Sequence, residues 1–222
     1  MNVHVTSTVT RRLAAVTATA GILAAAGIAG AGAASAEEVG PGKGSTNAAT
    51  ISRTVSGDDL VGGSIPTGSR ITITNTVTRT LGWLIYSVRD NHPSCLQPVD
   101  QTSVWKVSGG TYTNNPDGAG TKKPSEVTTG DGWVQIKASG ASSWQATPLV
   151  WSQDYIVACD PGDLNTGGVE TTSTNLIGGT KANDIGPAIT VTKKSGGGID
   201  PGDIGDTGSL STGSLGGLFG SS

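Results

Sequence analysis

The apolar residues of this chain recur at every second position in short runs, and this period restricts the fold more than any other feature. Between residues 47 and 194 no stretch shows the i, i+3, i+4, i+7 spacing that a packed helix needs. The runs are separated by Gly, Pro, Asn and Asp, which favour turns. The pattern predicts an all-β sandwich with strands at 48–55, 70–80, 82–89, 103–108, 133–138, 148–151, 155–159 and 188–192.

The segments between these runs predict one tight turn and two long loops. Ser108-Gly109-Gly110-Thr111 has the composition of a two-residue hairpin turn. Residues 113–131 and 160–183 carry no strand pattern, so we expect surface loops there, and loops of that length often carry function.

Residues 1–36 have the composition of a secretory signal. Arg11 and Arg12 precede a long run rich in Ala, Gly, Val and Ile, which ends in Ala34-Ser35-Ala36, a sequence suited to signal peptidase. The run is about long enough to span a bilayer, so a transmembrane helix is the alternative. The weakly apolar residues and the acidic pair Glu37-Glu38 favour cleavage and export by the general secretory route, with the twin-arginine route left open. No later stretch is apolar enough to span a membrane.

The remaining chain divides by composition. Residues 37–46 are polar and Gly-rich, which predicts a linker, and residues 47–194 form the predicted domain. Residues 195–222 are dominated by Gly, Ser, Asp and Thr and predict a disordered tail. Apolar residues gather at the end of this tail, where they could act as a weak hydrophobic anchor: Leu210, Leu215, Leu218 and Phe219.

The chain contains two cysteines, Cys95 and Cys159. An even count in an exported protein indicates a disulfide rather than two free buried thiols. The bridge would close a long loop, which is worth about 4 kcal/mol if it stabilises by restricting the unfolded chain.

Two of the predicted strands carry a family resemblance. Strand 70–80, preceded by a Pro-Thr-Gly turn, resembles the B strand of bacterial immunoglobulin-like modules, and Trp83 falls where such domains often place a core aromatic residue. The segment 154–159, with Tyr155 in it, resembles an F strand with a corner tyrosine. The chain is similar to secreted immunoglobulin-like proteins of high-GC actinobacteria, which implies an immunoglobulin-like antiparallel β-sandwich.

The residues that catalysis would need are scarce. His92 is the one histidine after the signal, and Asp90-Asn91-His92-Pro93 has a turn composition, so we expect an exposed turn histidine. No HExxH, paired CxxC or Gly-rich loop ending in Lys-Ser/Thr occurs, so we expect no metal and no cofactor. Most acidic residues sit beside Gly or Pro, where Asp serves turns rather than a carboxylate pair. We therefore expect no catalytic residue and no enzyme activity.

The segment from Trp133 to Ala138 gives the one candidate binding site. Val134 and Ile136 alternate with Trp133, Gln135 and Lys137, so these three share the opposite side of the strand. If the apolar side faces the core, Trp133 is left beside polar donors, as in sites that hold a sugar ring or a partner surface. The alternative is that the adjacent long loop covers the indole.

Strand 70–80 shows a similar division. Its threonines share one side, which predicts a solvent-facing surface. Asn75 is the exception on the apolar side and needs a polar partner if it is buried.

Two functions remain open. One is a non-catalytic secreted or cell-surface binding module for a glycan or protein. The other is a structural component of the cell envelope, tethered by its tail to a lipid, glycan or surface protein. A formal net charge of −3 disfavours nucleic-acid binding, which needs a basic surface. Either function places the protein outside the cytoplasm.

Overall fold

The computed structural model describes residues 36–80, 82–139, 144, 148–175 and 177–194. The predicted tail and all but the last residue of the predicted signal lie outside these ranges. Within them the chain is all-β, as predicted, and its one helical element is the 3-10 turn η1 (Pro124–Glu126). No helix in the described ranges is long and apolar enough to cross a membrane.

The larger sheet has eight strands, all paired antiparallel except β8 with β9. Its order is β1 (Glu37–Ser45), β2 (Ala49–Gly57), β4 (Arg70–Arg79), β12 (Leu149–Val157), β7 (Val104–Val107), β8 (Gly110–Thr113) and β9 (Thr121–Lys122), with β6 (Leu96–Pro98) also on β12. Ser108 and Gly109 connect β7 to β8 with φ angles of 55° and 77°, which confirms the predicted tight turn.

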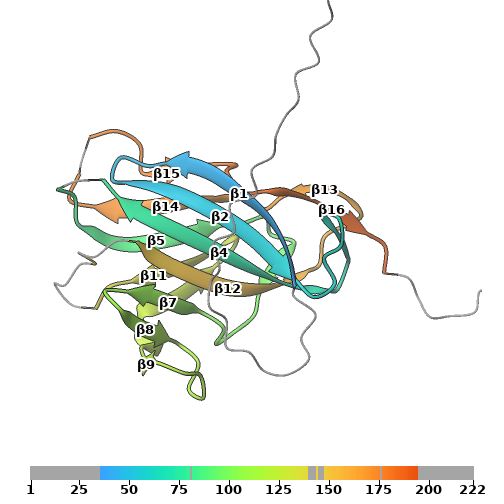
Figure 1. Cartoon of the computed structure of the whole chain (residues 1–222), viewed down its shortest axis with the longest axis horizontal. Coiled ribbons are helices and arrows are strands. Elements are labelled where there is room, and N and C mark those ends of the chain that lie inside the picture. The colour runs from blue at the N-terminus through green and yellow to red at the C-terminus, as the bar shows by residue number, and fades with distance from the viewer. Residues whose placement is uncertain (1–35, 81, 140–143, 145–147, 176, 195–222) are drawn as a thin grey trace, which may run out of the picture. The chain divides into compact units, whose positions relative to one another are not determined.

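A second, five-stranded sheet lies against the first. Its order is β10 (Val127–Gly130), β11 (Trp133–Lys137), β5 (Ile85–Asn91), β14 (Gly168–Ser173) and β15 (Lys181–Ala182), all antiparallel. Figure 1 shows β2 and β4 running over β5 and β14. A small third sheet joins β13 (Gly162–Asn165), β16 (Ala188–Thr192) and β3 (Ser64–Pro66).

One hydrophobic core fills the space between the sheets, because the inward side of each strand contributes to it. In β4 the apolar residues are buried while the threonines at alternate positions are at least partly exposed, as predicted. Trp105 and Trp151 are the largest fully buried side chains. Trp83, which we expected in the core, is only half-buried.

The predicted disulfide between Cys95 and Cys159 is present, with the two Cα atoms 4.7 Å apart. It joins the residue before β6 to the segment after β12, across a sequence separation of 64. The amide of Ala158 also donates to the carbonyl of Cys95. The bridge therefore fixes the start of β6 at the end of a central strand.

The prediction of a linker at 37–46 was wrong, since residues 37–45 form β1 and pair with β2. Close backbone contact, rather than burial of side chains, holds this strand. A Cβ atom at Gly42 would lie 1.8 Å from the carbonyl oxygen of Ile185, so only glycine fits there. The Glu37 carboxylate accepts hydrogen bonds from the amides of Gly62 and Gly63, at 2.8 and 3.1 Å. The sandwich thus begins at Glu37 rather than at residue 47.

The prediction of long loops at 113–131 and 160–183 was also wrong, since both segments contain strands. The first contains β9, η1 and β10, and the second contains β13, β14 and β15. Most of these strands are short and carry few apolar side chains, so the alternation used to recognise strands is missing. Their backbone hydrogen bonds to neighbouring strands define them instead.

Candidate functional site

Strand β11 places the predicted binding residues on its outward side. Val134 and Ile136 are fully buried, Trp133 and Gln135 are half-buried, and Lys137 is exposed. The predicted division of this strand is therefore confirmed. That these residues bind a ligand stays a prediction.

The register of the sheet joins these residues to others that the sequence did not single out. Trp133 lies opposite Asn91, which lies opposite Gly168, and the following residues continue the row toward Asn183. A second row lies beside it on the same side of the sheet. We call the two rows the outer polar face: Trp133, Asn91, Gly168 and Asn183, then Gln135, Arg89, Glu170 and Lys181.

Arg89 is the centre of this face. Its guanidinium carbon lies 4.3 Å from the centroid of the Trp133 ring, within the range of a cation–π contact. Its Nε donates to the Oε1 atom of Gln135 at 3.0 Å, and Nη1 lies 3.9 Å from a carboxylate oxygen of Glu170. The planar guanidinium is thus held in one orientation on a partly exposed surface, with donors left for a ligand.

The indole of Trp133 is fixed rather than free. A Cβ atom at Gly130 would lie 2.3 Å from its Cε2 atom, so the ring lies over a position that must lack a side chain. Because Arg89 also contacts the ring, Trp133 is not the open stacking surface that the sequence suggested. It instead supports Arg89 and offers only part of its ring to a ligand.

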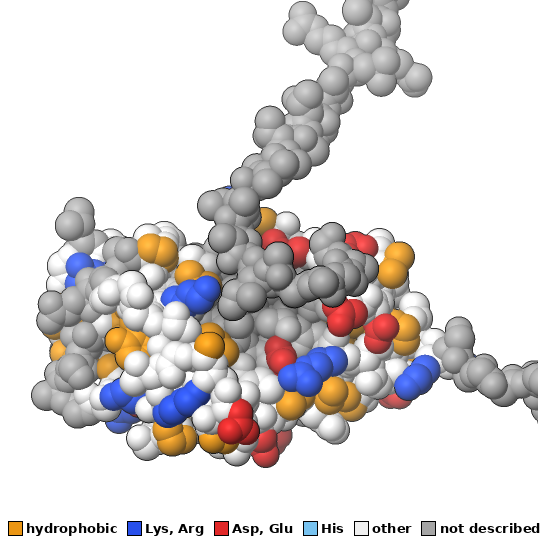
Figure 2. Space-filling view, turned by 60° about the horizontal axis from the view of Figure 1, so that its bottom comes forward, with side chains coloured by type: hydrophobic (Ala, Val, Ile, Leu, Met, Phe, Trp, Pro, Cys, Tyr) orange, Lys and Arg blue, Asp and Glu red, His pale blue; other side chains and the backbone are white. Residues whose placement is uncertain are grey.

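The charges on the outer polar face are mixed. Lys181 lies 3.7 Å from Glu170, which also contacts Arg89, so one carboxylate is shared by two cations. On the side of the molecule shown in Figure 2, Lys and Arg side chains are scattered and do not form one basic stripe. Such a distribution attracts polyanions weakly.

A second polar cluster lies between the sheets. Arg53 of β2 forms an ion pair with Asp90 of β5 at 2.8 Å, and both side chains are fully buried. Asn75 of β4 accepts from Arg53 and donates to Asp90, each at 3.0 Å, so the predicted partner for Asn75 exists. Because this cluster is closed to solvent, it has no access to a ligand.

His92 was expected to be an exposed turn residue, and this was wrong. The side chain is buried, and its ring packs edge-on against Tyr155 with centroids 4.9 Å apart. Asp90, in the same segment, points into the core rather than serving a turn, because β5 extends to Asn91. Burial raises the pKa of Tyr155 well above its ordinary value, and the nearby Asp90 carboxylate raises it further.

No three His, Cys, Asp or Glu side chains come together as metal ligands in the described ranges. The candidate site is therefore the outer polar face, made of amide, guanidinium, ammonium and carboxylate groups beside one indole. Sequence reasoning identified β11 but missed Arg89, the last residue of the predicted strand 82–89, because only the register of the sheet brings it beside β11 and β14. It missed Glu170 and Lys181 because both fall in a segment predicted to be a loop.

Two solved structures show a low likeness to this chain. One is a Corynebacterium diphtheriae protein described as membrane-anchored, with a TM-score of 0.40, 15% identity, and coverage of 59% of this chain and 32% of that one. The other is the collagen-binding domain of the Erysipelothrix rhusiopathiae surface protein RspB, with a TM-score of 0.36, 12% identity, and coverage of 64% and 45%. This chain thus spans less than half the length of either. No protein-family profile and no curated protein sequence matches it.

Proposed function

We propose that this protein is a non-catalytic binding module that works outside the cytoplasm and holds a glycan on the outer polar face. The observation that carries the proposal is the arrangement of Arg89, which Trp133, Gln135 and Glu170 hold in one orientation on an accessible sheet surface. A side chain fixed before binding loses little conformational entropy when the ligand arrives.

The polarity of the face favours a glycan over a protein. Protein interfaces usually have an apolar centre surrounded by polar residues. Among the described residues the exposed large hydrophobic side chains are Val61 and Ile177, and neither belongs to this face. Hydroxyl-rich ligands are held by amides and charged groups beside an aromatic ring, which is the set found here.

The disulfide supports a location outside the cytoplasm, because such bonds form and persist in oxidising compartments. The predicted signal at 1–36 agrees with this. The alternative of a tail-tethered structural component depends on residues outside the described ranges.

The test is the binding of the purified full chain to a glycan array and to insoluble cell-envelope polysaccharide. Arg89→Ala should weaken binding by about fivefold or more, since truncation of an anchoring residue costs more than about 1 kcal/mol. Arg70→Ala is the matched control. Arg70 is also an exposed arginine paired with a carboxylate, that of Asp154, but it lies on the other sheet.

Equal binding by Arg89→Ala and the wild-type protein would show that the face is not the site. Binding that requires Arg89 but occurs only to proteins would show that the ligand class is wrong. Absence of binding to every glycan tested would also contradict the proposal.

A further inference from the structure

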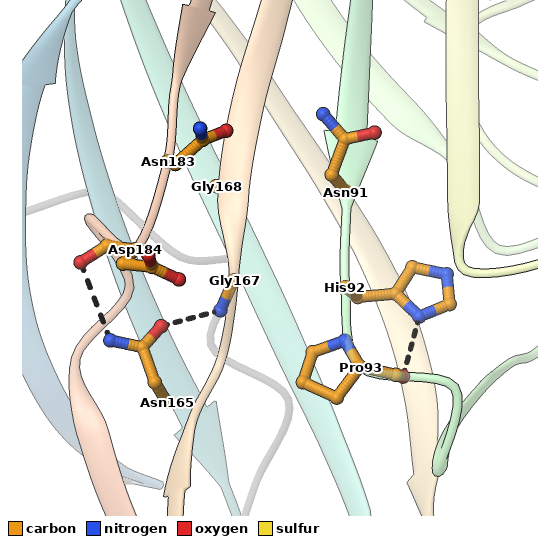
Figure 3. Close-up of a pocket in the computed structure, with 8 residues that line it drawn as sticks. All are labelled: Asn91, His92, Pro93, Asn165, Gly167, Gly168, Asn183 and Asp184. Carbon is orange, nitrogen blue, oxygen red and sulfur yellow. Dashed lines mark hydrogen bonds between the residues drawn. The ribbon is translucent and has the colours of Figure 1, made fainter.

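A groove lies at one end of the outer polar face, along Asn91, Gly168 and Asn183 of its first row. It has a volume of about 280 Å³. Figure 3 shows the amides of Asn91 and Asn183 on either side of Gly168, while the His92 ring points away from Asn165 and Asp184. The lining residues are Asn91, His92, Pro93, Asn165, Gly167, Gly168, Asn183 and Asp184.

The polar side chains at the mouth of the groove have unused hydrogen-bonding capacity. Within the described residues, the side chains of Asn91, Asn183 and Asp184 make no hydrogen bond to the rest of the protein. Two amides and one carboxylate together offer both donors and acceptors. A sugar hydroxyl also donates and accepts, so this set matches a ligand with several neighbouring hydroxyl groups.

The backbone of the groove is held in an uncommon conformation. Asp184 has a φ angle of 51°, which is uncommon for a residue with a side chain. The side-chain amide of Asn165 donates to the carbonyls of Asp184 and Gly186 at 3.3 Å, and its oxygen accepts from the amide of Gly167 at 2.8 Å. Asn165 is therefore a positioning residue that holds one wall of the groove in place.

The floor of the groove is formed by two glycines that the packing requires. A Cβ atom at Gly167 would lie 2.1 Å from the carbonyl oxygen of Asn91, and one at Gly168 would lie 2.3 Å from that of Ala182. Asn91 of β5 and Asn183, the residue directly after β15, thus flank a bare backbone. Two strands that flank a third are separated by twice the usual strand spacing, or roughly 10 Å, which is room for one sugar ring between side chains on either side of Gly168.

We propose that this groove binds a single neutral pyranose ring, a subsite within the glycan-binding role proposed above. Its volume lies just below the range of about 300–1,000 Å³ that is usual for small-molecule pockets, which suits one ring rather than a chain. The lining contains no Lys or Arg, so it offers no partner for an acidic sugar. Trp133 lies next to Asn91 in the same row, where it would meet the following unit of a longer glycan.

The test is an NMR titration of the isotope-labelled full chain, with EDTA present, using the methyl glycosides of glucose, galactose and mannose in turn. At least one of them should give saturable shifts in the Asn91 and Asn183 side-chain amides and in the Gly168 amide. Asn91→Ala and Asn183→Ala should each weaken that binding by about threefold to tenfold, the value of one or two hydrogen bonds. Ser52→Ala, on the outward side of β2 in the other sheet, is the control and should not change it.

Three results would overturn the inference. The first is that none of the three glycosides shifts these signals. The second is that calcium chloride, without EDTA, shifts the same residues while the sugars do not, which would make the groove a cation site. The third is a polysaccharide whose binding Arg89→Ala abolishes and both asparagine variants leave intact. That last result would leave the proposed function standing and remove only the subsite.

Discussion

Arg53 and Asp90 form an ion pair between the two sheets in which neither side chain is accessible to solvent. Both Nη atoms of the arginine donate to the carboxylate, at 2.8 and 3.0 Å, and Nη2 also donates to the carbonyl of Thr166. In the described part of the chain, some buried polar atoms in and beside this pair nevertheless lack well-aligned hydrogen-bond partners. Within the described residues, Nε of Arg53 and the hydroxyl of Tyr155 are buried without a geometrically sound hydrogen bond.

Removing one member of this pair should destabilise the fold strongly. Asp90→Ala leaves the guanidinium buried without its counter-ion, which typically costs about 3–5 kcal/mol. The measurement is the free energy of unfolding in urea. A loss of under about 1 kcal/mol would mean that water or a rearranged side chain compensates the arginine.

Replacing both members is the control. Arg53→Met combined with Asp90→Leu removes the charges and the cost of burying them together, so the double variant should be more stable than Asp90→Ala alone. Asn75 would still need a partner in that variant, which limits the recovery.

The disulfide should supply a large part of the net stability. Replacing Cys95 and Cys159 by alanine together should lower the free energy of unfolding by about 4 kcal/mol, the value expected for a loop of this length. Urea unfolding of the variant and of the reduced wild-type protein should agree, because both lack the same constraint. A variant as stable as the oxidised protein would show that contacts between β6 and β12 hold the loop by themselves.

The positions of the buried polar residues follow from the sequence pattern. Arg53 alternates in phase with Ile51 and Val55, and Asn75 with Ile73 and Val77. The period of 2 alone therefore places both polar residues on the core side of their strands. Their contact with Asp90 could not be predicted in this way, because β2 and β4 belong to one sheet and β5 belongs to the other.

The strands that the sequence missed have a different cause. β1 has Val39 and β14 has Val169 as its single aliphatic side chain, so neither strand shows the repeated apolar alternation by which strands are recognised. Close approach of backbones defines them, and composition does not report that. The register between β5, β14 and β15 brings together Arg89, Glu170 and Lys181. The sequence alone does not give that register, so it could not show that these three residues are neighbours.

Substitution of Gly42 tests whether close backbone contact holds β1 in place. Gly42→Ala places a methyl group against the carbonyl of Ile185, so β1 must shift, at a cost of about 1–3 kcal/mol. Gly179→Ala is the matched control, because nothing lies within 4 Å of a Cβ atom there. Thermal unfolding should separate the two variants, and equal melting temperatures would mean that β1 adjusts without loss.

Tyr155 should make the fold sensitive to alkaline pH. Burial and the Asp90 carboxylate raise its pKa well above the ordinary value of 10.0, so the phenol stays protonated in the fold. In the unfolded chain it ionises at about pH 10, so above that pH the unfolded state binds fewer protons and stability falls as pH rises. Above about pH 10, ionisation of Tyr155 in the unfolded chain should lower the free energy of unfolding by about 1.4 kcal/mol per pH unit. Below about pH 9 the phenol is protonated in both states, so Tyr155 adds no pH dependence there.

Tyr155→Phe removes this component while keeping most of the ring packing against His92. Urea unfolding should therefore give parallel pH profiles for the two proteins between about pH 7 and pH 9, and a shallower decline for the variant above about pH 10. Lysines and the other tyrosines titrate in both proteins, so the difference between the profiles isolates Tyr155. Profiles that stay parallel to about pH 11 would show that Tyr155 ionises within the fold without penalty, and that the side chain is less enclosed than its burial indicates.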